Sequence, residues 1–483
     1  MKTLKLFSAG LLACAAASLA SAITPTVVDV AGSTAFRTAA VNAEIALLNH
    51  AGANLPGGVS QGAFIGSSLT GATISVVYGY DGGGNEIMFR NHWSGSAAGV
   101  YDCANATVLS QLPVTTTLAN TPAGNSVAAG SDTDTGSTDI AFTDSQAADA
   151  AATVVTGING STFANTINSA GLINAGTTAN KNKGVAVVTF QWCLGVNASD
   201  PTNWAAINYN LTQQQGATLI SQGFISLADV TANSADATTF LLFVGRNEDS
   251  GTREAYEAES LGGGTLNNAN AFGAAVNQYM VKQSGVAYPT GPLTDGLGNS
   301  YPAIGVVAGG VTGFKLWPRL QAAPANTGWT VNTIPSLTWK TIGHSGYNGG
   351  GDVSAILRTP DPVAIASFTD GVSNAPAGAT KIYFVSWLGT SDVNTVTGAG
   401  GKACSYNGIP FSANAVAEGQ YTAWTFEHIY YLPALAGVQK TAADGLADTF
   451  AGFTTAQIGA AGMSIGDLLN GLARGQGAGS RIP

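Results

Sequence analysis

The residues with the clearest capacity for chemistry lie in one short stretch, GRNEDSGTREAYEAES, at positions 245–260. It gathers five acids, two arginines and a Ser-Gly-Thr step in a chain of 483 residues of which only 10% are charged. Arg246 carries a rigid fork of N–H donors that can meet two oxygens of a phosphate or carboxylate at once. The start of a helix leaves backbone N–H groups without partners and bears the positive end of the helix dipole, so it attracts anions. The stretch therefore indicates an oxyanion site.

Each feature of this stretch also has a plainer interpretation. Ser, Thr and Asp are the ordinary N-caps of helices. Arg246 could pair with Glu248 or Glu254 on the surface, where an ion pair contributes little. In either case we expect Glu254, Glu257 and Glu259 to form the solvated face of the helix that follows the loop.

The elements that must position such a loop recur along the chain as units of strand, small-residue loop and helix. The units span 27–30, 31–34 and 35–48; then 86–90, 94–96 and 97–109; then 139–142, 143–145 and 146–152; and finally 240–244, 246–252 and 253–261. Strands that alternate with helices predict an α/β fold with mainly parallel sheets. Four such loops in one chain favour an anion site more strongly than any single loop does.

Several of these loops resemble one known family. RNEDSGT resembles the Arg-x-x-x-Ser-Gly-Thr loop of the phosphate-binding proteins that serve ABC transporters, which have the type 2 periplasmic solute-binding fold. Further pieces occur in that family's order: GSTAF at 32–36, WSGSAAGV at 93–100, STDIAFTDS at 137–145, LTQQQGATLISQGFISLADV at 211–230, GGGDVSAIL at 349–357 and EGQYTAWTFEHIYY at 418–431. The motifs are short, so their order and spacing over residues 27–432 carry the resemblance.

The resemblance implies an α/β, two-lobed fold with the ligand in the cleft between the lobes. Each lobe would be a mainly parallel sheet flanked by helices, and two crossover strands would join them. Lobe 1 is expected to comprise residues 23–188 and 389–483, with a C-terminal extension. Lobe 2 would comprise residues 189–388, with a glycine-rich insertion at about 262–345.

The resemblance also implies a set of ligand-binding residues. They are Ser33, Thr34, Ala35, Phe36, Ser96, Asp144, Arg246, Ser250, Gly251 and Thr252. Asp144 matches the family's acceptor carboxylate. A carboxylate repels a bound anion unless the anion has a proton to give, as hydrogen phosphate does and sulfate does not, so Asp144 would exclude sulfate. The alternative role of Asp144 is that of a helix N-cap.

The first residues have the pattern of a secretory signal peptide. Lys2 and Lys5 precede an apolar stretch at 6–19 and a small-residue site that ends at Ala22. We expect cleavage after Ala22 and a periplasmic or extracellular protein; the alternative is a lipoprotein acylated at Cys14. No later stretch has the ~20 apolar residues of a membrane span. The net charge of −10 argues against nucleic acid and anionic lipid as partners.

Three cysteines remain after such cleavage: Cys103, Cys193 and Cys404. Two of them could pair, and the spacing does not say which, or all three could be small buried apolar residues. The scattered histidines and the lack of zinc-site or phosphate-loop motifs lead us to expect no metal and no cofactor.

These observations together predict an exported, monomeric solute-binding protein and not an enzyme. It would capture an oxyanion, inorganic phosphate before others, and deliver it to an ABC-transporter permease. One alternative is a secreted surface or matrix scaffold of the same fold, suggested by the composition rich in Gly, Thr and Asn. Another is a phosphatase-like hydrolase, which would need an activated serine such as Ser250.

Overall fold

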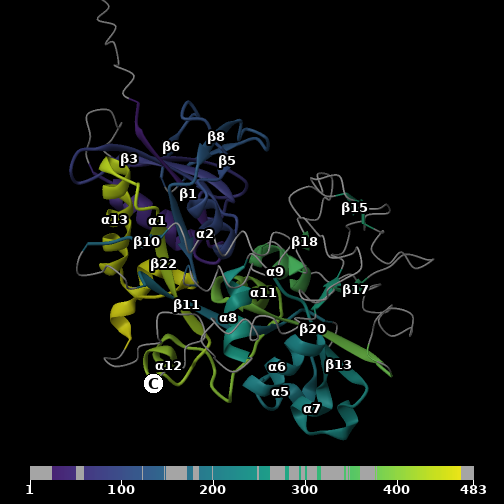
Figure 1. Cartoon of the computed structure of the whole chain (residues 1–483). Helices are drawn as coiled ribbons and strands as arrows, with labels where there is room; N and C mark the ends of the chain where they lie inside the picture. The colour runs from purple at the N-terminus through teal and green to yellow at the C-terminus, as the bar shows by residue number, and fades with distance from the viewer. Residues whose placement is uncertain are drawn as a thin grey trace, which may run out of the picture.

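The structure is a computed structural model (Figure 1). It describes residues 24–50, 59–121, 123–145, 147, 171–177, 184–197, 200–246, 250–260, 278–281, 293–294, 300–301, 313–316, 342–343, 346–347, 349–358, 376 and 378–468. The predicted signal peptide, with Cys14, lies outside these residues. So do most of the predicted insertion and all but one residue of the predicted helix at 146–152.

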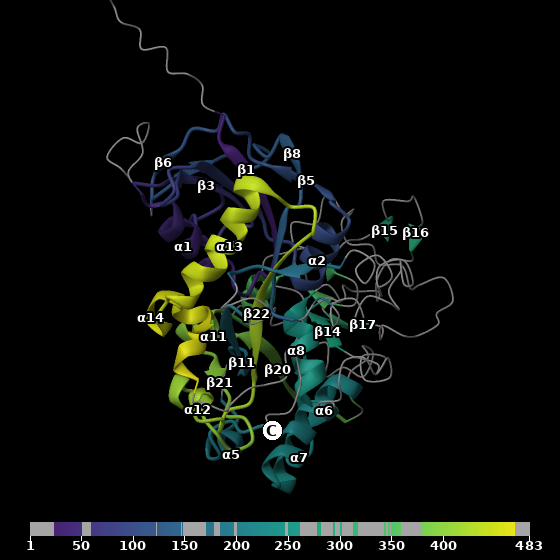
Figure 2. The same cartoon turned by 60° about the vertical axis from the view of Figure 1, so that its left-hand side comes forward.

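A mixed β-sheet runs through the molecule, with helices packed against it (Figures 1 and 2). In its first half, β1 lies parallel between β4 and β9, and β22 runs antiparallel to β9. From the outer edge inward, this half consists of β6 (Ala119–Asn120), β2 (Gln61–Ile65), β3 (Ile74–Tyr80), β4 (Glu86–His92), β1 (Thr26–Gly32), β9 (Ile140–Thr143) and β22 (Trp424–Tyr431), with β7 (Asn125–Val127) beside β2 and β10 (Ile173–Asn174) beside β22.

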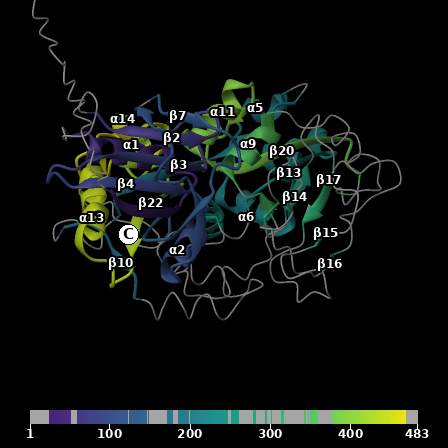
Figure 3. The same ribbon diagram turned by 90° about the horizontal axis from the view of Figure 1, so that it is seen from above.

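The second half of the sheet lies beside the first (Figure 3). Here β13 and β20 are parallel, and β12 and β11 flank them in the antiparallel sense. The strands are β12 (Phe224–Ser226), β13 (Thr239–Phe243), β20 (Lys381–Gly389) and β11 (Ala186–Leu194), and β21 (Lys402–Ala403) and β23 (Gly462–Met463) pair with β11.

Strand β11 joins the two halves. Its first residues, 186–189, pair with β22, and its last residues, 190–194, pair with β20. All nine of its residues are buried, which explains the nearly unbroken apolar run AVVTFQWCL. The α/β class, with sheet halves joined through crossover strands, is thereby confirmed, while the lobe boundaries at 188 and 388 stay a prediction.

Helices cover both halves. On the first half they are α1 (Arg37–Leu48), α2 (Ser96–Ala104), α13 (Gly437–Ala451) and α14 (Thr455–Ile458). Around the second half lie α5 (Thr202–Ala205), α6 (Gln213–Gln222), α7 (Leu227–Thr231), α8 (Gly251–Ser260), α9 (Gly350–Arg358), α11 (Thr390–Gly398) and α12 (Ala413–Ala417), with 3-10 turns η2 (Ser234–Asp236), η4 (Gly459–Ala461) and η5 (Ile465–Asp467). Among the described residues, no helix combines the length and apolar character needed to cross a membrane.

Short antiparallel pairs make up what is described of the residues between α8 and α9. They are β14 (Gln278–Val281) with β17 (Gly313–Leu316), β15 (Leu293–Thr294) with β16 (Ser300–Tyr301), and β18 (Ile342–Gly343) with β19 (Gly346–Tyr347). Strands β14 and β19 lie near each other and near the loop that follows β13. The described pieces of the predicted insertion are thus short antiparallel pairs.

The second predicted helix ends earlier than expected. The sequence predicted helix from 97 to 109, but α2 ends at Ala104, and β5 (Val108–Gln111) follows and pairs with β8 (Asp134–Ser137). Ala106 has a left-handed φ of 47°, which breaks the helical course. Thr107 and Val108 then supply the β-branched residues that favour a strand.

The three described cysteines are all free and buried. Cys193 lies opposite Ala403 in the β11–β21 ladder, so the side chain of the next residue, Cys404, points to the other face of the sheet. The two thiols accordingly belong to different hydrophobic clusters. The interpretation as small buried apolar residues therefore holds for all three.

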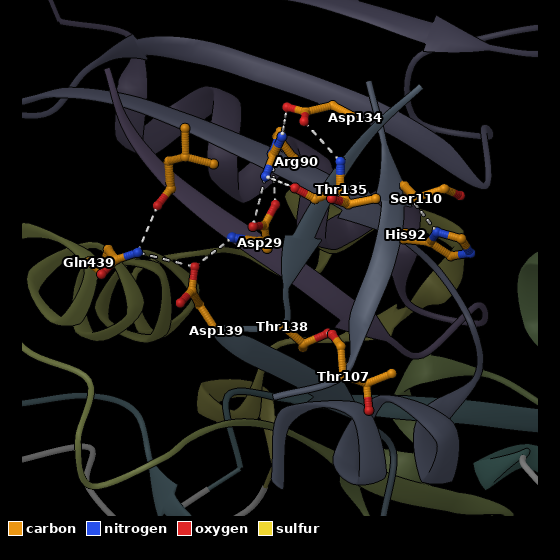
Figure 4. Close-up of polar contacts among 11 residues, drawn as sticks. Asp29, Arg90, His92, Thr107, Ser110, Asp134, Thr135, Thr138, Asp139 and Gln439 are labelled. Carbon is orange, nitrogen blue, oxygen red and sulfur yellow. Dashed lines mark hydrogen bonds and ion pairs between the residues drawn. The ribbon is translucent and has the colours of Figure 1, made fainter. Parts of the chain in front are cut away.

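An ionic network ties the first half together (Figure 4). Arg90 on β4 donates to both carboxylate oxygens of its cross-strand partner Asp29, at 2.7 and 2.9 Å, and to Asp134 at 2.6 Å. Asp139 accepts from the backbone N–H of Asp29 at 2.9 Å and from Gln439 on α13 at 3.2 Å. Gln439 also donates to the carbonyl of Val27, so a C-terminal helix is fastened to the first strand.

We expect the folded protein to carry three unpaired thiols at Cys103, Cys193 and Cys404. The reason is the opposite-face placement of Cys193 and Cys404 and the burial of Cys103 in α2. Alkylation in denaturant without a reducing agent, followed by peptide mass spectrometry, would label each one. Recovery of a cystine-linked peptide pair would contradict this placement.

The stability of the protein should fall as pH rises through the titration of Asp139. Burial raises the pKa of this carboxyl to about 6 from 3.8, and the negative charge of Asp29 acts in the same direction. Because the folded state binds this proton more tightly, its contribution is complete below pH ~4 and is lost by pH ~6, a change of about 3 kcal/mol in the free energy of unfolding.

Asp139→Asn should remove this part of the pH dependence, since an amide oxygen can still accept from Asp29 and Gln439. Urea unfolding between pH 4 and 7 measures the effect, with Asp132→Asn as the matched control. Equal pH slopes in wild type and Asp139→Asn would refute the assignment.

Candidate functional site

Arg246 follows β13 directly and is held inside the protein. Its side chain is 1% exposed, and its Nε donates to the carbonyl of Tyr347 on β19 at 3.2 Å. The carbonyl of Arg246 accepts from the side chain of Gln278 on β14 at 3.0 Å. Backbone pairing between Arg246 and Tyr347 adds a further constraint. The guanidinium is therefore oriented by the segments between α8 and α9.

Asp144 lies at the end of β9, on the other half of the sheet. It is 1% exposed, and the hydroxyl of Ser96, the first residue of α2, donates a short hydrogen bond to Oδ1. The second oxygen, Oδ2, is buried and has no hydrogen-bond partner among the described residues. A buried acceptor without a donor is unfavourable, so this oxygen is suited to a donor that a ligand would bring. Its alternative role as an N-cap concerns the helix predicted at 146–152, outside the described residues.

The two halves of the sheet meet where Gly251 approaches Asp144 and Ser96. A Cβ atom on Gly251 would lie 2.6 Å from Asp144 Cγ and 2.7 Å from Ser96 Oγ, closer than non-bonded atoms can stand. Gly251 is the first residue of α8, whose initial N–H groups have no acceptor within the helix. Only a residue without a side chain lets the start of α8 come this near to the carboxylate.

The first loop lies in the same region. Ser33 donates its backbone N–H to the carbonyl of Phe142, two residues before Asp144, at 2.9 Å, and Gly95 donates to the carbonyl of Gly32 at the same distance. The methyl group of Ala35 lies 3.5 Å from the position that a Cβ on Gly389 would occupy, at the end of β20. The first loop therefore touches both sheet halves.

Some predicted ligand residues already have structural partners. The hydroxyl of Ser33 accepts from the N–H of Phe36 at 3.3 Å, and that of Ser250 accepts from the N–H of Arg253 at 3.3 Å. Ser250 is therefore the N-cap of α8, whereas Ser33 closes the turn that leads into α1, and the hydroxyl hydrogens of both can still be donated. The ring of Phe36 packs on Phe450 in the core, with centroids 5.3 Å apart.

The remaining predicted residues occupy the same helix starts. Thr252 is 2% exposed on the first turn of α8, and Thr34 is partly exposed in the first loop. All ten predicted residues thus lie at the start of α1, α2 or α8 or at the end of β9 or β13. Their role in binding a ligand stays a prediction.

The prediction of a solvated face on α8 was wrong for Glu254 and Glu257. Both are at most 1% exposed, and Arg253 Nε binds Glu257 Oε1 at 2.7 Å with both side chains fully buried. Helix α8 packs against α6 and β20, so these charged residues are buried, and Arg253 and Glu257 pair with each other within the helix. A surface ion pair of Arg246 with Glu254 is likewise excluded, because both residues are buried.

The charges around Arg246 determine the electrostatics of the site. Burial lowers the pKa of the guanidinium, and the carboxylates of Asp392, Asp144 and Asp352 oppose that change. Burial raises the pKa of Asp144, while the hydrogen bond from Ser96 and the charge of Arg246 counteract the rise. Within the described part of the chain, no group of three or more His, Cys, Asp or Glu residues is placed to hold a metal ion.

Sequence reasoning missed several residues that belong to this region. Asp392 stands on the first turn of α11, and a Cβ on Gly350 would lie 3.1 Å from Asp392 Cγ and 3.7 Å from Arg246 Nη1. The sequence held a signal for it, since strand 381–389 followed by Gly-Thr-Ser-Asp repeats the strand–loop–helix pattern. Tyr347 and Gln278 had no such signal, because they support Arg246 from a segment with no periodic pattern.

No protein-family model matches the chain, and no curated protein matches it. Among solved structures it is similar to an ABC-type phosphate transport receptor from Vibrio cholerae, with 11% identity, 87% of this chain and 93% of that chain covered, and a TM-score of 0.35. It is also similar to PstS from Borrelia burgdorferi, with 10% identity, 87% and 92% covered, and a TM-score of 0.31. TM-scores this low carry no argument about function.

Gly251→Ala should separate α8 from the Asp144–Ser96 pair. The added methyl group overlaps both partners, so we expect a loss of about 1–3 kcal/mol in the free energy of unfolding. The matched control is Gly351→Ala, where a Cβ meets nothing within 4 Å and a helix gains stability. Chemical denaturation of the three proteins checks the difference, and a neutral Gly251→Ala would contradict the close approach.

Proposed function

We propose that the protein captures a tetrahedral oxyanion that carries a proton, hydrogen phosphate in the first place, between the two halves of its sheet. In this proposal it is an exported solute-binding protein that offers its ligand to an ABC transporter. The N-terminal signal pattern supports export. The observation that carries the proposal is the burial of Arg246 and Asp144 close to each other, with no donor to Asp144 Oδ2 among the described residues.

The groups at this site suit an oxyanion. Arg246 supplies a fixed positive charge, and the starts of α2 and α8 supply N–H groups and the positive ends of helix dipoles. Hydroxyls of Ser250 and Thr252 add donors that can turn toward a ligand. Capture would then use hydrogen bonds and electrostatic attraction, with no covalent step.

Asp144 gives the proposed site its selectivity. Its Oδ1 is occupied by the hydroxyl of Ser96, and its Oδ2 can accept a proton-bearing oxygen of the ligand. Hydrogen phosphate and hydrogen arsenate have such an oxygen, whereas sulfate would place a bare oxygen against a buried carboxylate. The repulsion between this sulfate oxygen and the carboxylate of Asp144 would lower the affinity for sulfate.

The same geometry weighs against a role as a scaffold alone. A scaffold has no need to bring a buried arginine and a buried carboxylate from opposite sheet halves to one place, because burying such groups is unfavourable in itself. A glycine at the contact and an arginine braced from two further strands serve a site better than they serve packing.

Calorimetric titration of the purified protein with phosphate, arsenate and sulfate tests the proposal. We expect binding of phosphate and arsenate and rejection of sulfate. Arg246→Ala should weaken phosphate binding at least about 100-fold, since it removes the charge-assisted contact. Arg246→Lys keeps the positive charge but not the two-pronged guanidinium, so its phosphate affinity should lie between those of wild type and Arg246→Ala. The control is Lys402→Ala, at an exposed ion pair with Asp200, which should leave the affinity unchanged.

Asp144→Asn should weaken the rejection of sulfate, because an amide N–H can donate to an oxygen that has no proton. Absence of heat with all three anions would leave the scaffold role. Phosphate affinity that is unchanged in Arg246→Ala would refute the site even if the protein binds phosphate elsewhere.

A further inference from the structure

Glu427 is a buried acid with no structural partner in the described residues. It lies in the middle of β22, is fully buried, and neither of its carboxylate oxygens has a hydrogen-bond partner there. Its backbone is firmly held, since its carbonyl accepts from the N–H of Val185 at 2.7 Å and it pairs with Ala186 on β11. An ionised carboxylate in this position would be strongly disfavoured.

Glu427 adjoins Asp144 across two antiparallel strands. In the β9–β22 ladder Thr143 lies opposite His428, so Asp144 and Glu427 are the next residues on the two chains. Side chains at such opposed positions have Cβ atoms about 5 Å apart. The negative charge of Asp144 acts on Glu427, and together with burial it raises the pKa of Glu427 well above the ordinary value.

In the described part of the chain, no cationic side chain pairs with Glu427. On β11 the residue opposite it is the apolar Ala186, and His428 on the same strand points to the other face, where it stacks on Tyr430. On α13, which packs against β22, Lys440 binds Asp444, and Asp444 also accepts from Tyr431. Arg246 faces Asp144, so its charge is already matched there.

One proton would satisfy the orphaned oxygens of this pair. An ionised carboxylate can only accept hydrogen bonds, whereas a protonated one has an O–H to donate. Two carboxyl groups that share a buried site cannot both ionise, and such a pair holds one proton between them. An oxygen of Asp144 can accept from two donors, so a hydrogen bond from Glu427 leaves room for one from a ligand.

We propose that Glu427 is held as the neutral acid and that its O–H donates a hydrogen bond to Oδ2 of Asp144, which fixes Asp144 as the charged acceptor that selects the ligand. The effect on ligand selection rests on the proposed function, whereas the protonation of Glu427 rests on the structure alone. A donor at 427 stabilises the ionised form of Asp144, so rejection of sulfate extends to lower pH. Without that donor Asp144 takes up a proton more readily and ceases to exclude sulfate.

Glu427→Gln and Glu427→Leu separate the two effects. The amide of Gln keeps a donor toward Asp144 without a titrating proton, whereas Leu has similar bulk and no donor. The control is Glu44→Gln, at another fully buried acid, whose pKa is raised to about 8 by burial and whose Oε2 accepts from Asn91. Among the described residues, Glu44 has no hydrogen bond to the ten predicted ligand residues, so its replacement should leave anion binding unchanged.

Urea unfolding without any anion tests the proton. Because a raised carboxyl pKa stabilises the fold at low pH and this contribution is lost as pH rises, the unfolding constant of wild type should climb more steeply above pH ~4.5 than that of Glu427→Gln, by up to about tenfold per pH unit. Identical slopes in the two proteins would overturn the proposal.

Sulfate titration between pH 5 and 8 tests the effect on Asp144. In Glu427→Leu sulfate should bind at a pH about one unit higher than in wild type, whereas Glu427→Gln and Glu44→Gln should show no upward shift. A common onset of sulfate binding in Glu427→Leu and Glu427→Gln would refute the hydrogen bond to Asp144. If no protein binds phosphate, arsenate or sulfate, the proposed function fails, and the unfolding slopes still decide the state of Glu427.

Discussion

A full positive charge at Arg246 lies out of contact with water, and the groups that compensate it come from distant parts of the chain. Asp392 stands at the start of α11, Asp144 at the end of β9 and Asp352 on α9. The carbonyl of Tyr347 orients the guanidinium, and Gln278 holds the backbone carbonyl of Arg246. An isolated buried charge would be prohibitive, so these elements have to assemble together. The close approach of α8 to β9 and the joining of the sheet halves through β11 are parts of the same assembly.

Local pattern was sufficient for most of the fold. Strands 27–30 and 86–90 fall within β1 and β4, strands 139–142 and 240–244 match β9 and β13 to within one residue at each end, and the alternation with helices predicted the α/β class. The sequence pattern failed to predict where α2 ends and which face of α8 is buried, because hydrophobic periodicity and composition do not determine either. Helix α2 stops because Ala106 takes a left-handed conformation, and α8 turns Glu254 and Glu257 inward because it packs against α6 and β20. Neither fact is visible in a window of sequence, since both depend on what lies on the far side of the element.

The candidate site divides in the same way. The residues at helix starts were predictable, because a strand, a small-residue loop and a helix bring N–H groups and hydroxyls to one edge of a parallel sheet. The residues that brace or tune them were not. Tyr347 acts through a backbone carbonyl, which any residue type could provide, and Glu427 reads in sequence as one polar position inside a strand. Asp392 is the exception, as its loop repeats the pattern found elsewhere and could have been recognised.

The first half of the sheet has a consequence for how the chain can reach this structure. Its central strand β1 begins at residue 26. The inner strand of the same half, β22, pairs with β9 and comes from residues 424–431, and Gln439 of α13 donates a hydrogen bond to β1. More than 400 residues of the chain therefore separate segments that must come together before this half is complete. Contacts between residues so far apart in sequence form slowly, because the chain loses conformational entropy on closing the loop before the contacts can stabilise it. The four main strands of the second half, β11, β12, β13 and β20, lie between residues 186 and 389, so they precede the terminal helices in the chain and can serve as the template on which the first half assembles.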